Sequence, residues 1–153
     1  MTTRPAAVAG MFYPAERDEL HEMVSGMLRE VANSDAPPPK AIIAPHAGYI
    51  YSGPVAASAY ARLAASRRTI RRVVLLGPSH RVGFLGIAAS SADYFHTPLG
   101  DVPIDHELRE QVLQIKGVQP FDQAHQMEHS LEVHLPFLQE VLDSFTLVPL
   151  VVG

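Results

Sequence analysis

Short apolar runs alternate with helical patterns along the chain, and this alternation restricts the folds open to it. The runs at residues 41–44 ("AIIA"), 72–77 ("RVVLLG") and 145–153 ("FTLVPLVVG") have the length and aliphatic content of strands. An uninterrupted apolar run is typical of a strand buried on both faces, as in a parallel sheet covered by helices. The sequence therefore predicts an α/β fold with a mostly parallel central sheet flanked by helices.

Helical spacing separates these runs. Residues 14–31 carry an amphipathic stripe, and the proline-rich stretch after them reads as a linker. A second helix is expected to begin at Pro54, and a third after Asp105 as N-cap. Leucines at helical spacing predict a last helix over residues 128–143, with Pro136 marking a kink or the start of its regular part. Between residues 84 and 101 the pattern predicts short strands and turns.

Composition excludes several classes of protein. The 153 residues suit one domain, and a net charge of −4 argues against a nucleic-acid partner. No apolar run reaches the ~20 residues of a membrane span, so no membrane partner is expected. The absence of cysteine excludes thiolate ligands and fits a cytoplasmic location.

The last apolar run ends at residue 153. A buried parallel strand is normally followed by a crossover that covers the sheet. We therefore expect a single α/β domain over residues 1–153 that is the N-terminal part of a longer domain.

Two of the eight histidines occupy equivalent places. His46 follows the run at 41–44 in the turn "PHAGY", and His80 follows the run at 72–77 in "GPSH". If these strands are parallel neighbours, both imidazoles arrive at the carboxyl edge of the sheet, where α/β proteins bind ligands. The pattern predicts a metal site on His46 and His80, although imidazole alone does not distinguish Zn, Cu, Fe and Ni.

A competing motif lies in "AHQMEHSLEVH". His125, Glu128 and His129 spell H-x-x-E-H, in which two histidines on one helical turn bind zinc and the glutamate is the general base. This motif defines a zinc hydrolase as an alternative function.

Five segments also occur, in this order, in the Memo family, the mediators of ErbB-driven motility whose bacterial relatives are called AmmeMemoRadiSam system protein B. They are "AGMFYP", "APHAGYIYSG", "GPSH", "TPLGDVPID" and "EHSLEVHLPFL". The chain resembles this family from about Ala9 to Gly153. The resemblance implies a fold like that of the class III extradiol dioxygenases, with His46 and His80 at the metal and His129 in the cleft wall. Family members are longer, and the resemblance places their remaining site residues beyond residue 153.

The leading hypothesis is a Memo-like protein with a non-heme iron or copper ion and a redox or dioxygenase-related role. His129 and Tyr49 are candidate catalytic groups, and Glu128, Glu132 and Ser79 are candidates for positioning the ligands. A small molecule, or a protein or peptide, would occupy the cleft. The rival hypothesis is a protein- or phosphopeptide-binding module in which the histidines are structural.

Overall fold

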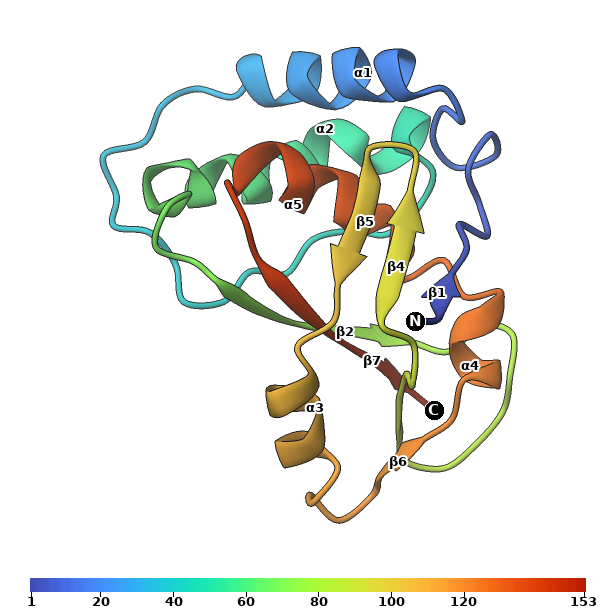
Figure 1. The fold of residues 1–153 in the computed structure, drawn as a ribbon. Coiled ribbons are helices and arrows are strands. Elements are labelled where there is room, and N and C mark those ends of the chain that lie inside the picture. Colours follow the sequence, from blue (N-terminus) through green and yellow to red (C-terminus); the bar gives the residue numbers. More distant parts are fainter.

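The computed structural model describes residues 1–153 as a two-sheet α/β structure (Figure 1). Its strands are β1 (Thr3–Arg4), β2 (Arg72–Pro78), β3 (Ile87–Ala89), β4 (Tyr94–Thr97), β5 (Gly100–Pro103), β6 (Val118–Pro120) and β7 (Thr146–Val152). Its α-helices are α1 (Arg17–Arg29), α2 (Tyr49–Tyr60), α3 (His106–Val112), α4 (Gln123–Gln126) and α5 (Leu135–Val141). Two 3₁₀ helices, η1 (Ala61–Ser66) and η2 (Glu132–His134), precede β2 and α5. The predicted α/β class is confirmed.

The larger sheet has the strand order β2-β7-β3-β6. The outer pairs β2–β7 and β3–β6 are parallel, whereas β3 and β7 are antiparallel. A second sheet, β1-β4-β5, lies beside it; the short strands expected between residues 84 and 101 are confirmed, but their pairing into a separate sheet was not expected. The central sheet is mostly parallel, as expected, since two of its three strand pairs are parallel, and the small sheet is an addition to it.

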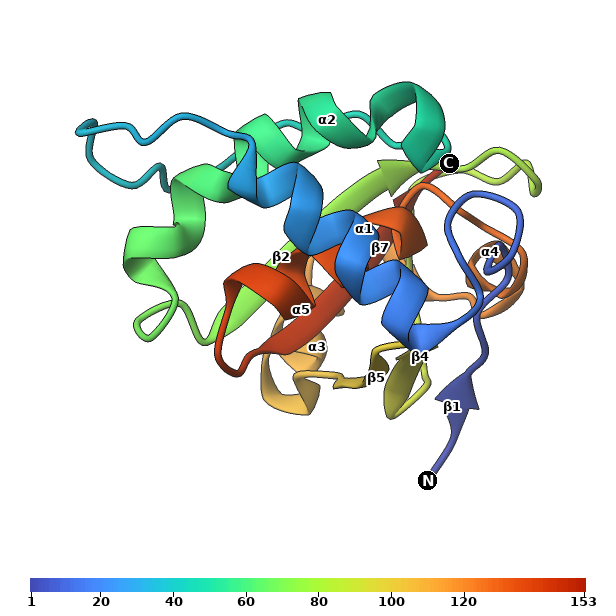
Figure 2. The same cartoon turned by 90° about the horizontal axis from the view of Figure 1, so that it is seen from above.

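Helices α1, α2 and α5 lie on one side of the larger sheet and α3 on the other (Figures 1 and 2). The main core fills the space between the larger sheet and helices α1, α2 and α5. Leu20, Phe137 and Leu147 are among its fully buried members. A smaller cluster on the opposite face packs Val148 and Leu150 against α3. None of the helices combines the length and apolar character needed to cross a bilayer.

Most of the predicted elements are confirmed, since α1, α3, α5, β2 and β7 fall within the expected ranges. Asp105 caps α3 by accepting a hydrogen bond from the Leu108 amide at 2.9 Å. Pro136 lies in the first turn of α5, where its missing N–H costs no intrahelical bond, so this helix starts near the proline instead of kinking.

Two local expectations are wrong. Residues 41–44 have no strand partner and form no ladder. Helix α2 begins at Tyr49, so Pro54 lies inside it and not at its first position. Packing explains the earlier start, because Tyr49 is buried against Phe137 with ring centroids 5.1 Å apart.

Strand β2 also departs from the expectation of burial on both faces. Val73 and Leu75 pack against the main core, but Val74 and Leu76 are 46% and 55% exposed. Strand β2 ends the sheet order and has β7 as its single neighbour. An apolar sequence therefore forms an edge strand here, whereas β7 is covered on both faces.

A buried ion pair anchors the N-terminal segment. The Arg4 guanidinium contacts the Glu132 carboxylate and donates to the carbonyls of His125 and Glu128, at 3.0 and 2.7 Å. Glu132 also accepts from the Tyr13 hydroxyl at 2.6 Å and from the amides of residues 7 and 8. Arg4 and Glu132 are both buried, so each compensates the charge of the other.

We expect Glu132→Gln to lower the free energy of unfolding by about 3–5 kcal/mol, because it leaves the buried Arg4 charge without a counter-charge. Urea denaturation at pH 7 measures this. The control is Glu107→Gln, which breaks an exposed contact with Arg72 and should cost no more than about 1 kcal/mol. Equal, small losses in both variants would contradict the assigned role of the pair.

Candidate metal centre

His46 reaches the site from an extended segment that runs directly into α2. It is half-buried and lies two residues before the N-cap, Gly48. The hydroxyl of Ser52 donates to the Ala47 carbonyl at 3.1 Å and holds the turn against the helix. The strand expected before His46 is absent, so the helix start positions this imidazole.

His80 follows β2 directly. The amide of Ser79 donates to the Val152 carbonyl at 2.8 Å, which extends the contact of β2 with β7 by one residue. Gly77 is required because a Cβ there would lie 2.7 Å from the Ser130 hydroxyl. That hydroxyl donates to the Pro78 carbonyl at 2.9 Å, so the loop carrying His129 packs against the end of β2.

His46, His80 and His129 converge. One ring nitrogen from each residue lies within 4.8 Å of those of the other two. The ring centroids are 5.3 Å apart for His46 and His80, 4.4 Å for His80 and His129, and 5.9 Å for His46 and His129. The two histidines expected to meet are therefore together, and His129 joins them as a third potential ligand.

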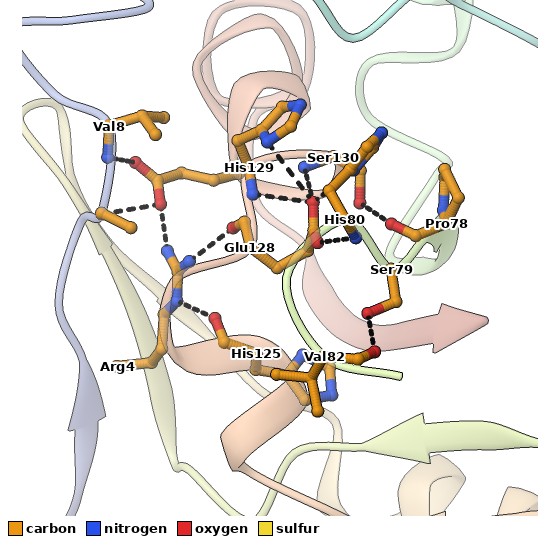
Figure 3. Close-up of polar contacts among 12 residues, drawn as sticks. Arg4, Val8, Pro78, Ser79, His80, Val82, His125, Glu128, His129 and Ser130 are labelled. Carbon is orange, nitrogen blue, oxygen red and sulfur yellow. Dashed lines mark hydrogen bonds and ion pairs between the residues drawn. The ribbon is translucent and has the colours of Figure 1, made fainter. Parts of the chain in front are cut away.

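Glu128 organises this cluster (Figure 3). Its buried carboxylate accepts from the His80 amide at 2.6 Å, and from the His129 and Ser130 amides at 2.9 Å each. It also contacts His80 Nδ1 at 2.9 Å. Burial alone would raise the pKa of Glu128, but the hydrogen bonds from the His80 and Ser130 amides outweigh it and lower the pKa to about 2. An ionised carboxylate only accepts, so the neutral tautomer of His80 that fits this contact carries its proton on Nδ1 and its lone pair on Nε2.

Burial favours the neutral form of the His46 and His129 imidazoles. Burial lowers the pKa of His46, and nearby His80 adds to the effect. Burial also lowers the pKa of His129, although Glu128 opposes the shift. His129 Nδ1 is buried without a hydrogen-bond partner, lying 3.5 Å from a Glu128 oxygen. Neutral imidazoles with free lone pairs are the form that binds metal ions.

A pocket of about 540 Å³ opens beside the cluster. Its lining residues are Phe12, Pro45, His46, Ala47, Gly48, Tyr51 and His129. The Phe12 ring packs on His129 with centroids 4.6 Å apart. The volume is within the usual range for small-molecule sites, and the walls are apolar apart from the histidines and the Tyr51 hydroxyl.

The remaining candidate residues lie away from the cluster. The Tyr49 hydroxyl is buried and donates to the Val133 carbonyl at 2.6 Å, so it faces the core. The Ser79 hydroxyl donates to the Val82 carbonyl at 2.6 Å. Glu132 binds Arg4 and Tyr13 and holds the N-terminal segment. Of the three groups expected to position the ligands, Glu128 alone contacts a histidine of the cluster.

The helical geometry required by the H-x-x-E-H hypothesis is wrong. Helix α4 ends at Gln126, so His125 and His129 do not share a helical turn. His125 is buried, with Nε2 3.0 Å from the Ala88 carbonyl and its ring edge-on to Phe95. It has no part in the histidine cluster.

The sequence did not place His129 with His46 and His80 as a potential metal ligand, and it did not reveal the buried ion pair of Arg4. The spacing of His129 within H-x-x-E-H is compatible with a helix, and nothing in the pattern shows that the helix stops before it. Arg4 lies near the N-terminus with no motif around it, although the lone arginine in an otherwise apolar start, "TTRPAAVAG", is a usable signal for a buried ion pair.

Fold and site together define an α/β protein with a three-histidine cluster that could hold a metal ion. Residues 4–153 match the family described as "Memo: Memo-like protein", and the chain belongs to this family. It is 44% identical over 153 residues to a MEMO1 family protein of Aquifex aeolicus, covering 99% of this chain and 55% of the relative. It is 39% identical to Protein MEMO1 of Homo sapiens over 155 residues, covering 98% of this chain and 51% of the relative. The chain thus spans about half the length of the curated relatives it matches.

Two buried histidines outside the cluster should make the stability of the folded chain depend on pH. Burial lowers the pKa of both His125 and His134 to about 4, and His134 Nδ1 is 2.9 Å from the Tyr60 hydroxyl. Below pH 6.5 the unfolded chain protonates these residues before the folded chain does. Stability should therefore fall as the pH drops from about 6.5 to 4, by on the order of 2–3 kcal/mol per histidine.

Denaturant unfolding at pH 7, 5.5 and 4.5 measures this slope. His134→Gln should be less stable at pH 7 but should lose less stability on acidification than the parent chain. His96→Gln is the control, since His96 is an exposed residue paired with Asp101. A slope unchanged in His134→Gln would contradict the assignment.

Proposed function

We propose that this chain is a metal-dependent Memo-family protein in which His46, His80 and His129 hold a non-heme iron or copper ion for redox chemistry. The observation that carries the proposal is the convergence of three imidazole nitrogens within 4.8 Å of one another. His46 and His129 are half-buried and His80 is exposed, so the three imidazoles gather where an ion from solvent can reach them.

The donor set fits a metal ion. Ligand nitrogens at about 2.0–2.1 Å from a tetrahedral ion lie about 3.4 Å from one another. Small side-chain rotations bring nitrogens that are within 4.8 Å to this spacing.

The protein groups have distinct roles in this proposal. Glu128 holds His80 in the tautomer that leaves Nε2 free, and its backbone contacts keep the loop with His129 in place. Phe12 and Pro45 form apolar walls beside the cluster. The bound ion would supply electron transfer and polarisation of a small oxidisable substrate or of O₂.

The pocket supports a small-molecule substrate. Its volume of about 540 Å³ accommodates a compound of modest size, with His46 and His129 exposed in its wall. In this proposal His129 serves as a ligand of the ion, so it is not available for the acid–base role that the sequence suggested for it. Since Tyr49 is bonded in the core, Tyr51 is the tyrosine that the pocket offers to a substrate.

The cluster also permits the rival function of a protein- or phosphopeptide-binding module with structural histidines. The exposed apolar residues around the pocket, including Tyr51, favour contact with another polypeptide. The two functions differ in a measurable way, since only the first requires a metal ion.

Anaerobic titration with Fe(II), and separately with Cu(I), tests the proposal. We expect one ion per chain, detected by calorimetry and by an upward shift of the melting temperature. His46→Ala, His80→Ala and His129→Ala should each abolish tight binding. Glu128→Gln should weaken binding by about 10–100-fold, as for other residues that orient a ligand.

The matched control is His21→Ala, which removes an exposed histidine paired with Glu140 and should leave the titration unchanged. Absence of binding by the parent chain, with normal folding, would overturn the proposal and favour the binding module. Equal binding by all variants would place the ion elsewhere.

A further inference from the structure

The imidazole of His129 is not oriented by a hydrogen bond. The ring of His80 is held through its Nδ1, which lies 2.9 Å from a Glu128 oxygen. His129 Nδ1 is instead buried without a hydrogen-bond partner, at 3.5 Å from the same oxygen. Histidines that bind metal ions usually donate their other ring N–H to a carboxylate or carbonyl, which fixes the orientation of the ring. The orientation of His129 therefore depends on what packs against its ring.

Two rings pack closely against this imidazole. The centroid of the His80 ring is 4.4 Å away, at an interplanar angle of 30°, and the centroid of the Phe12 ring is 4.6 Å away, at 46°. His80 belongs to the histidine cluster, so Phe12 supplies the closest aromatic contact from outside it. A phenyl ring offers no ligand atom, and its influence on a bound ion is exerted through this packing.

Phe12 lies in a short loop of residues 8–13, which we call the N-terminal loop. The Phe12 amide donates to the Val8 carbonyl at 2.9 Å, and the Gly10 amide donates to the Tyr13 carbonyl at 2.7 Å. Gly10 has a φ of 80°, a left-handed conformation that a residue without a Cβ adopts freely. The loop therefore carries the phenyl ring on a closed turn and not on a free N-terminal arm.

The buried carboxylate of Glu132 clamps both ends of the N-terminal loop. One oxygen, Oε1, accepts from the Val8 amide at 3.0 Å and from the Tyr13 hydroxyl at 2.6 Å. Glu132 lies three residues after His129 in the chain. The loop is thus fastened to the segment that carries the imidazole it covers.

The backbone of Phe12 is also bound to the start of α2. Its carbonyl accepts from the Tyr49 amide at 2.8 Å. His46 lies three residues before Tyr49. The N-terminal loop therefore has a fixed position relative to two of the three segments that carry the cluster.

We propose that Phe12 is a positioning residue for His129: its ring, fixed by the N-terminal loop, keeps the His129 imidazole in the rotamer that turns a ring nitrogen toward His46 and His80. Without the phenyl ring the imidazole would rotate about its side-chain torsions and expose its buried nitrogen to water. This inference deepens the proposed function and rests on it in so far as His129 is a ligand of the ion. It also gives Glu132 a part in the site, since this carboxylate holds the loop whose ring packs on His129.

NMR of the metal-free chain with labelled histidine measures the rotamer of His129 directly. We expect three-bond couplings about χ1 of His129 to report one staggered rotamer in the parent chain and averaging over several in Phe12→Ala. In the same variant, the affinity for Fe(II) or Cu(I) in anaerobic titration should fall by about 10–100-fold, as for other groups that orient a ligand. Phe12→Tyr keeps the ring and should retain the single rotamer and the parent affinity.

Phe145→Ala is the matched control. Phe12 and Phe145 are both half-buried phenylalanines packed against the main core, but Phe145 precedes β7 at the end of the strand that lies away from the cluster. Its loss should lower the stability of the fold while leaving the His129 rotamer and the metal affinity unchanged. The control separates the packing of one ring on His129 from a general loss of stability.

The proposal is overturned if His129 already averages over rotamers in the parent chain, if it keeps a single rotamer in Phe12→Ala, or if Phe145→Ala shows the same averaging. An unchanged metal affinity in Phe12→Ala, with averaging present, would overturn it as well. The rotamer is measured without an ion. Absence of metal binding by the parent chain, which would overturn the proposed function, is therefore distinguishable from failure of this inference.

Discussion

The arrangement of the candidate site depends on one carboxylate. Glu128 accepts hydrogen bonds from the backbone at the end of β2 and from the loop that carries His129, so a single side chain joins two segments 48 residues apart in sequence. Hydrogen bonds to an ionised acceptor are stronger than neutral ones, and several of them converge here. Gly77 and Ser130 allow the two segments to approach closely enough for these bonds to form. Without this junction His80 and His129 would belong to independent loops.

Electrostatics in this part of the molecule follow from burial. The carboxylate of Glu128 stays ionised because backbone amides replace its hydration, while burial lowers the pKa of the half-buried His46 and His129. Negative charge is therefore concentrated beneath a set of uncharged nitrogen donors. Such a field attracts cations to the cluster and disfavours anions there, which is consistent with a cation site at the pocket wall.

Much of the fold could be predicted because it rests on local patterns. The stripe of α1, the cap at Asp105 and the aliphatic runs of β2 and β7 are properties of contiguous residues, and each gave the right element. The small β1-β4-β5 sheet could not be predicted, since strands of two to four residues carry almost no periodic signal. The exposure of Val74 and Leu76 could not be predicted either, because an apolar run does not reveal whether anything covers it.

The candidate site was likewise predictable only where local sequence patterns determine it. His46 and His80 stood out because each follows an apolar run in a proline-containing turn, although only β2 proved to be a strand. The role of His129 depends on where α4 ends, and the role of Glu128 depends on which loop packs against β2. Both are determined by tertiary packing, which the sequence pattern does not reveal. Tyr49 illustrates the converse, since its place in a motif near His46 suggested chemistry but its ring packs in the core.

The contact between Arg4 and Glu132 has a consequence for the order in which the protein assembles. The two residues are 128 positions apart, so a chain growing from a ribosome exposes the arginine long before its partner has been synthesised. The loop that this contact closes is nearly the whole chain, and closing long loops slows folding. The first eight residues therefore cannot be secured until synthesis has passed residue 132, which is also when the histidine loop can first reach β2. The candidate site and the N-terminal segment are thus completed together, by the same stretch of chain.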